Sequence, residues 1–225
     1  MPIRAFRQIS FAALFAVLGM PLVAEPAGSY LAARSAAVTG DYDAAARYYT
    51  RALTRDPSNP EILENASFAL LALGDIERAS VVASKLLADG QKSQVAQMAM
   101  LAEQASQENY ADVLARILEE QGVGPLVDGL LRSWAQVGIG EVTAALENFD
   151  EVGKERGLQG FALYHKALAL AMVGDYEGAD AIFAQPEAGA LRQTRRGAIA
   201  HIEVLSQLDR SEDALKMLTE SFGPD

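Results

Sequence analysis

The side chains best suited to metal binding or acid–base chemistry are two histidines, His165 and His201, in a chain of 225 residues. Imidazole is the commonest metal ligand and titrates near neutral pH, so two histidines on neighbouring helices could begin a metal site. No third ligand accompanies them in the sequence. We therefore expect both rings to be solvated or packed between helices, and we predict no metal site.

The motifs that most often carry catalysis or cofactor binding are also missing. The chain has no cysteine, which excludes disulfides, thiolate nucleophiles and cysteine–metal sites. It has no His-Glu-x-x-His motif and no nucleophile elbow, and Gly122, Gly124 and Gly129 have the wrong spacing for a dinucleotide loop. The acidic pair Glu119 and Glu120 is expected on a solvated helix surface. We predict no catalytic residue and no cofactor.

The charge of the chain narrows its possible partners. Half of the residues are apolar, which is enough for a folded core, and the formal net charge is −11. Such an acidic protein is a poor candidate for binding nucleic acid or anionic lipid through general charge attraction. Arg192, Arg195 and Arg196 could form a local basic patch, but we expect them at a solvated helix end.

Residues 1–24 differ from the rest and have the pattern of a secretory signal peptide. Arg4 and Arg7 precede a short apolar run, Ile9–Leu18, and small residues lead to a cleavage site after Ala24. The apolar run is short for a membrane span, which needs about 20 residues. We expect cleavage and a periplasmic or secreted bacterial protein that is not inserted in the membrane. An uncleaved anchor and a first helix of the fold are the alternatives.

A repeated tripeptide pattern indicates how the remaining chain is built. Gly40-Asp41-Tyr42 recurs about 34 residues later as Gly74-Asp75-Ile76 and again as Gly174-Asp175-Tyr176. The first copy separates a predicted helix at Ser29–Thr39 from a second helix, which Asp56-Pro57 should end. Each helix has one apolar face that it cannot bury alone. The two helices should therefore pair as an antiparallel hairpin and stack on the next hairpin.

The first unit resembles the tetratricopeptide repeat, a helix-turn-helix of about 34 residues. The residues that carry this resemblance are Gly40, Tyr42, Ala45, Tyr49, Ala52 and Pro57. It implies an all-α fold, a right-handed superhelical α-solenoid of about six helix-turn-helix hairpins across residues 25–225. The expected units lie near 26–59, 60–93, 94–125, 126–159, 160–194 and 195–225. Arg132 and Lys166 depart from the pattern, because each occupies a position where an apolar residue is expected.

The resemblance also implies a binding surface. In this family the first helix of each hairpin lines a concave groove through its second, fifth, ninth and twelfth positions. Carried onto this sequence, these positions are Tyr30, Arg34, Glu64, Phe68, Met98, Leu130, Trp134, Tyr164 and Leu168. Large aromatic side chains suit such a wall because they bury much area at small entropic cost. Phe68 and Trp134 could instead fill gaps between neighbouring helices, and both interpretations stay open.

We therefore expect an exported, non-catalytic adaptor that binds a protein or peptide in the concave groove. One alternative is the helical, non-catalytic part of a cell-envelope enzyme, for example a peptidoglycan-processing one, whose active portion lies beyond Asp225. Another is a signal-anchored assembly factor. The last predicted helix keeps an apolar face at Ala214, Leu218 and Phe222, which suggests a homodimer or a longer array through this end.

Overall fold

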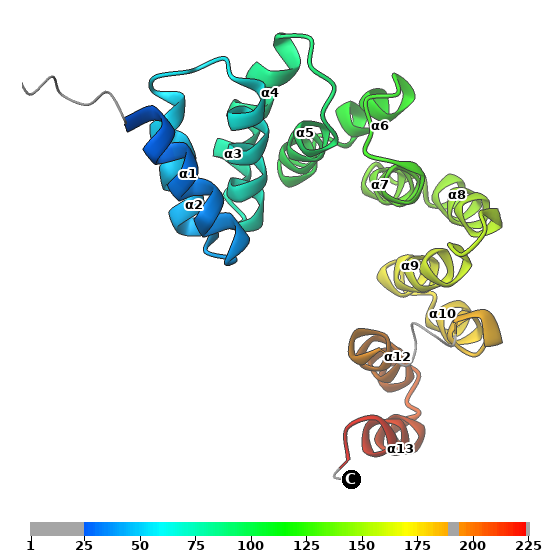
Figure 1. Cartoon of the computed structure of the whole chain (residues 1–225). Helices are drawn as coiled ribbons and strands as arrows, with labels where there is room; N and C mark the ends of the chain where they lie inside the picture. Colours follow the sequence, from blue (N-terminus) through cyan, green and yellow to red (C-terminus); the bar gives the residue numbers. More distant parts are fainter. Residues whose placement is uncertain (1–24, 189–193, 224–225) are drawn as a thin grey trace, which may run out of the picture.

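The computed structural model describes residues 25–188 and 194–223, so the expected signal peptide at 1–24 lies outside the described residues. Within these ranges the chain is helical, and its elements follow one another in pairs (Figure 1). The elements are α1 (Glu25–Val38), α2 (Tyr42–Leu53), α3 (Pro60–Ala72), α4 (Ile76–Ala88), α5 (Gln94–Ser106), α6 (Tyr110–Leu118), α7 (Pro125–Gly138), α8 (Val142–Lys154), α9 (Gln159–Met172), α10 (Tyr176–Phe183), η1 (Pro186–Ala188), α12 (Arg195–Gln207) and α13 (Ser211–Phe222).

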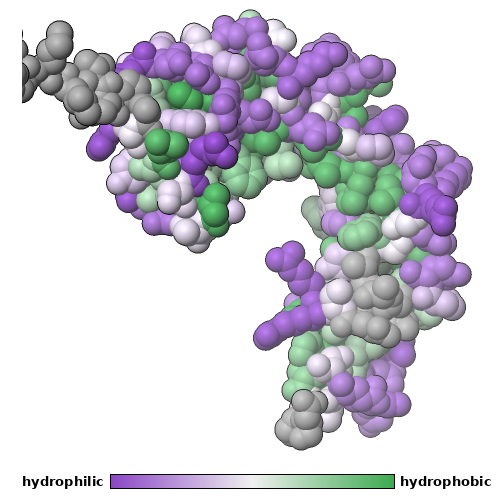
Figure 2. Space-filling view, viewed as in Figure 1, coloured by the Kyte–Doolittle hydropathy of each residue, from purple (hydrophilic) through white to green (hydrophobic). Residues whose placement is uncertain are grey.

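Each helix packs on the next, which makes the molecule an all-α solenoid of helical hairpins. The first helices of successive hairpins also touch, α3 with α5, α7 with α9, and α9 with α12. Figure 1 shows the result as an arch, with α5, α7, α9 and α12 on its inner side and α6, α8 and α10 on its outer side. Hydrophilic side chains gather along the outer edge, and hydrophobic ones reach the inner edge near α3, α5 and α7 (Figure 2).

The turns of the hairpins explain why the Gly-Asp pattern is repeated. After α1, Gly40 takes a left-handed conformation with φ of 76°, and its N–H donates to the Ala37 carbonyl at 3.1 Å. The next residue, Asp41, donates its own N–H to the Ala36 carbonyl and caps α2 by accepting from Ala44 N–H. This is the geometry in which glycine closes one helix and a carboxylate opens the next. The third turn keeps the left-handed residue, Glu108 with φ of 58°, but the next residue, Asn109, makes no side-chain cap.

The core is a chain of clusters along the array, since each hairpin buries its apolar face only against its neighbours. In the second helices a small residue is buried at Ala45, Ala79, Ala145 and Ala179. Four residues further along, an aromatic ring is fully buried at Tyr49, Phe149 and Phe183. Ala83 and Ile117 take this place in the hairpins of α3–α4 and α5–α6. The end of α2 at Leu53 comes before Asp56 and Pro57, which lie in the loop to α3.

The loop between α6 and α7 is tight and is held by one carboxylate. Asp128 accepts hydrogen bonds from Val123 N–H at 2.7 Å and from Gly124 N–H at 3.1 Å. A side chain at Gly122 would collide with this carboxylate, its Cβ lying 2.1 Å from Oδ2. The Gln94 amide on α5 donates to the Val123 carbonyl at 2.9 Å. The loop therefore continues the array from one hairpin to the next.

Candidate functional site

The candidate site is a pocket between α9 and the start of α12. Phe161 and Leu168 each lie three and four residues from the pair Tyr164 and His165, so the four residues lie on one side of α9. This face contributes one wall of the pocket. The other wall is the first turn of α12, where the Thr194 hydroxyl accepts from Gly197 N–H at 3.1 Å and so fixes where the helix begins.

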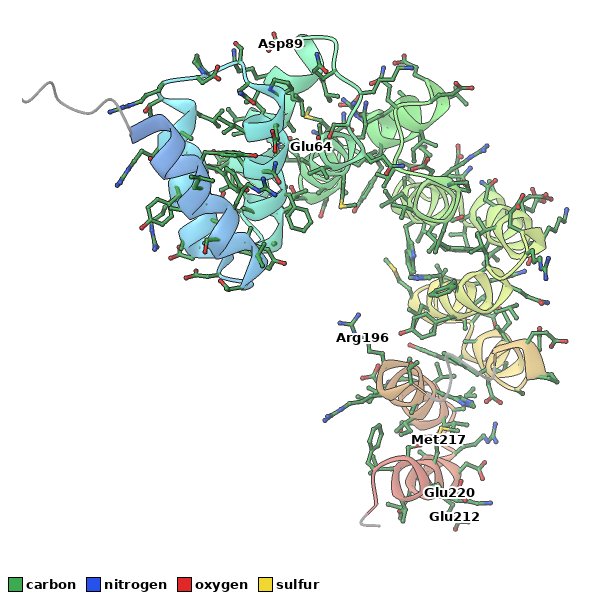
Figure 3. All side chains as sticks on the ribbon, in the orientation of Figure 1. Glu64, Asp89, Arg196, Glu212, Met217 and Glu220 are labelled. Carbon is green, nitrogen blue, oxygen red and sulfur yellow. The ribbon has the colours of Figure 1, made fainter. Side chains whose placement is uncertain are left out.

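The pocket has a volume of about 500 Å³ and an apolar floor with a cationic rim. Its lining residues are Phe161, Tyr164, His165, Leu168, Thr194, Arg195 and Arg196. Arg196 is exposed, and Figure 3 shows its side chain pointing from α12 into the hollow of the arch. The Arg195 guanidinium lies 5.7 Å from the centre of the Phe222 ring on α13. The site can therefore hold an apolar group and an anionic group side by side.

A hydrogen bond from the neighbouring hairpin sets the chemical state of His165. The Trp134 indole Nε1–H on α7 donates to His165 Nδ1 at 3.1 Å. Since an indole can only donate, Nδ1 must carry no proton, and the proton of the neutral ring lies on Nε2. Among the described residues, that Nε2–H has no hydrogen-bond partner. The ring that lines the pocket thus keeps one free donor.

Burial lowers the pKa of His165 below its usual value, because the charged imidazolium loses more hydration than the neutral ring. Protonation would also place a hydrogen on Nδ1 and break the bond from Trp134. Both effects favour the neutral ring in the folded chain around neutral pH.

The free energy of unfolding should decrease as the pH is lowered, and His165 should account for part of this decrease. Below about pH 6.5, His165 binds a proton more readily in the unfolded chain than in the folded chain. Lowering the pH therefore favours the unfolded state and reduces the free energy of unfolding. We expect the wild type to lose more unfolding free energy between about pH 7.5 and about pH 5.5 than His165→Gln, by up to about 1 kcal/mol. Urea unfolding at each pH measures the two slopes. Parallel slopes would contradict the assignment.

The sequence-derived groove residues lie in several separate environments. In the first hairpin, the Tyr30 hydroxyl donates to the Glu61 carboxylate, and the Arg34 guanidinium lies 5.9 Å from the centre of the Tyr30 ring. On α3, the Glu64 carboxylate accepts a hydrogen bond from the Ser93 hydroxyl at 2.9 Å, on the side facing α5 (Figure 3).

Phe68 and Met98 are the exposed apolar members of the set. Phe68 is 47% exposed, and its ring meets the edge of Tyr42 at 5.8 Å between centres. Met98 on α5 is 43% exposed. Both residues therefore leave apolar surface open to a partner on first helices.

The remaining members of the set divide between the core and the pocket. Leu130 and Trp134 pack against the buried cluster of α7, α8 and α9, where the Trp134 ring meets Phe149 at 5.9 Å. Tyr164 and Leu168 line the pocket. The ring of His165 joins the two groups, because it touches both Trp134 and Tyr164.

Sequence reasoning did not assign Phe161, His165 or the two arginines to a binding surface. Phe161 and His165 have a detectable signal in their spacing. Phe161 stands three residues before Tyr164, and His165 stands three residues before Leu168. Arg192, Arg195 and Arg196 are predicted at a solvated helix end; Arg195 and Arg196 are exposed in the first turn of α12, and Arg192 lies outside the described residues. Their closeness to α9 depends on how two hairpins pack, which no local pattern reveals.

The second histidine is buried in a structural cluster. His201 Nε2 lies 2.7 Å from Asp180 Oδ1, and its ring stacks on Phe183 at 4.8 Å. Burial alone would raise the pKa of Asp180, but the His201 hydrogen bond and the Arg210 guanidinium outweigh it and hold that pKa below its usual range. In the described part of the chain, no group of three or more His, Asp or Glu side chains could hold a metal ion.

Comparison with known proteins identifies the fold. Residues 39–105 match the family model of the tetratricopeptide repeat. A crystal structure of a tetratricopeptide repeat protein from Parabacteroides merdae ATCC 43184 is similar over 88% of this chain and 79% of that chain, with a TM-score of 0.68 at 14% identity. No curated protein sequence matches this chain closely enough to be called a relative.

Two other solved structures are less similar overall. The MamA protein aligns over 88% of this chain and 90% of its own, with 14% identity and a TM-score of 0.39. The Naa15/Naa10 complex bound to HypK-THB aligns over 87% of this chain and 36% of that chain, with 15% identity and a TM-score of 0.37.

The fold and the site together define the class of protein: an α-solenoid of antiparallel hairpins whose first helices line an inner surface. Residues 39–105 match the tetratricopeptide repeat, and the described chain shares the fold of a tetratricopeptide repeat protein. This fold is in general a scaffold for protein–protein interaction. In the described residues, none of the helices is long and apolar enough to cross a membrane.

Proposed function

We propose that this protein is an exported, non-catalytic adaptor that binds a protein or peptide partner on the inner face of its helical array. The observation that supports this most is the pocket between α9 and α12, where first helices of two hairpins present apolar rings and free donors. Exposed apolar side chains on the first helices α3 and α5 extend the same kind of surface. A partner could thus contact several hairpins at once.

The export part of the proposal rests on residues 1–24, whose basic start, short apolar centre and small-residue end are typical of a signal peptide. We place the mature chain in the periplasm or outside a bacterial cell. There it would hold proteins of the cell envelope together.

Site-specific photo-crosslinking in cells tests the proposal. The full chain would carry a benzophenone amino acid in place of Phe161, of Phe68, or of Val81, which is 66% exposed on the second helix α4. We expect one crosslinked protein to be shared by Phe161 and Phe68 and to be absent at Val81. N-terminal sequencing of the same exported chain checks cleavage after Ala24.

A matched substitution gives the quantitative readout. With the crosslinker in place of Phe68, Phe161→Ala should weaken recovery of the crosslinked protein by at least about fivefold, because a large aromatic anchor in a pocket contributes strongly to binding. The fold should persist, since Phe161 is 42% exposed. Equal crosslinking at Val81 and Phe161, or unchanged recovery with Phe161→Ala, would contradict a partner on the inner face.

A further inference from the structure

We propose that the α9–α12 pocket recognises an acidic protein segment, in which a bulky apolar side chain enters the pocket and neighbouring carboxylates meet Arg196 and the Nε2–H of His165. This inference rests on the proposed function and adds the chemistry of the partner to it. The expected ligand is a peptide or protein segment that carries Asp or Glu next to a residue such as leucine.

The apolar part of the pocket is the wall formed by α9. Phe161 and Leu168 lie at the two ends of the four-residue face, and the Tyr164 ring stands between them. A volume of about 500 Å³ is ample for one large side chain together with the polar groups beside it. Burying a leucine-sized group strengthens a complex by at least about tenfold, and this contact would hold the segment in place.

The polar groups of the pocket are N–H donors and cations. Arg196 has no ion-pair partner within the described ranges, and its side chain points into the hollow (Figure 3). Arg195 adds a second positive charge while it lies over the Phe222 ring. His165 is held as a donor at Nε2 by the Trp134 bond. Cations and N–H donors pair with carboxylates and would leave a basic ligand unpaired.

The net charge of the whole chain does not oppose an acidic partner at this place. The chain carries a formal charge of −11, so a distant acidic segment meets an average repulsion. At physiological ionic strength, however, charges further apart than about 8 Å are largely screened. The contacts at the rim are direct and are screened much less. Local complementarity therefore decides which segment fits, and the surrounding negative charge discourages binding elsewhere on the surface.

The test uses four acetylated and amidated heptapeptides that differ only around a central residue. The first has leucine flanked by glutamates; the others have glutamines as flanks, lysines as flanks, or alanine in place of leucine. The single tryptophan, Trp134, gives one indole N–H signal in a ¹H–¹⁵N spectrum, and its bond to His165 makes that signal a reporter of the pocket. Titrations yield a dissociation constant for each peptide.

We expect the glutamate–leucine peptide to shift the Trp134 signal to saturation. The glutamine version should bind about fivefold more weakly, the alanine version at least about tenfold more weakly, and the lysine version weakest of all. Arg196→Gln should remove most of the glutamate preference. The matched control is Arg47→Gln, because Arg47 pairs with Asp43 on the distant helix α2. This control should leave all four constants unchanged.

Several results would overturn the inference. Lysine-flanked peptide binding as tightly as the glutamate version, no saturable shift with any peptide, or an unchanged preference in Arg196→Gln would each reject an acidic ligand. A similar shift with sodium phosphate alone would indicate a general anion site and would also reject it. The crosslinking at Phe161 is independent of these titrations. A crosslinked partner together with failed acidic peptides would leave the adaptor function standing and reject only this ligand.

Discussion

Phe149→Ala is expected to lower the free energy of unfolding by about 3–5 kcal/mol, because it empties a fully buried position between α7, α8 and α9. Phe149 is 0% exposed and packs with Val137, Ala145 and Ala169. Its ring also meets the edge of Trp134 at 5.9 Å. Truncation loses the transfer free energy of the ring and leaves a cavity that these neighbours fill only in part. Urea unfolding followed by far-UV circular dichroism measures the loss.

The position of Phe149 in the array adds a second expectation. In a solenoid each hairpin is stabilised only by its neighbours, so a defect at one interface acts locally. The Trp134 ring lies against this interface, and its fluorescence should therefore change at lower urea than the circular dichroism signal in Phe149→Ala. In the wild type the two transitions should lie closer together.

Two substitutions separate the effect of the buried position from the effect of removing an aromatic ring. Phe149→Leu keeps much of the volume and should cost only about 1 kcal/mol. Phe161→Ala removes the same ring from the exposed wall of the pocket and should cost less than about 1 kcal/mol. If Phe149→Ala and Phe161→Ala shifted the urea midpoint equally, the assignment of Phe149 as a central core residue would be wrong.

The hairpins could be predicted from the sequence because their turns are decided by local residues. At Gly40 and Asp41 the left-handed conformation and the carboxylate cap are properties of two adjacent side chains. The small and aromatic pair at Ala45 and Tyr49 likewise marks the buried face of one helix. Such signals need no knowledge of the neighbouring hairpin. The all-α solenoid of hairpins that they predict is confirmed.

The pocket could be predicted only in part, because it is formed between hairpins. The face that carries Tyr164 and Leu168 follows from helical spacing, but the approach of Arg196 on α12 depends on tertiary packing. Lys166 shows the same limit. It occupies a position where an apolar residue was expected, and its ammonium reaches the Asp150 carboxylate on α8 at 2.6 Å. The ion pair with Asp150 explains how Lys166 is accommodated at a position where the repeat pattern predicts an apolar residue.

Gly129→Ala is expected to destabilise the protein by about 1–3 kcal/mol, although alanine is the better helix former by about 1 kcal/mol. A Cβ at Gly129 on α7 would lie 2.4 Å from Val152 Cγ2 on α8, well inside van der Waals contact. Val152 is buried and β-branched, so its side chain has little freedom to move away. The two helices would have to separate. Urea unfolding of the variant measures the cost.

Two further variants distinguish this steric cause from a general effect of the substitution. Gly28→Ala on α1 meets no atom within 4 Å, so it should stabilise the chain by about 0.5–1 kcal/mol through helix propensity alone. Adding Val152→Ala to Gly129→Ala removes the methyl group that the new Cβ would strike. The double variant should therefore be less destabilised than the sum of the two single changes. Additive losses, or a stabilising Gly129→Ala, would show that α7 and α8 tolerate a side chain between them. The close packing of the two helices would then not require glycine at position 129.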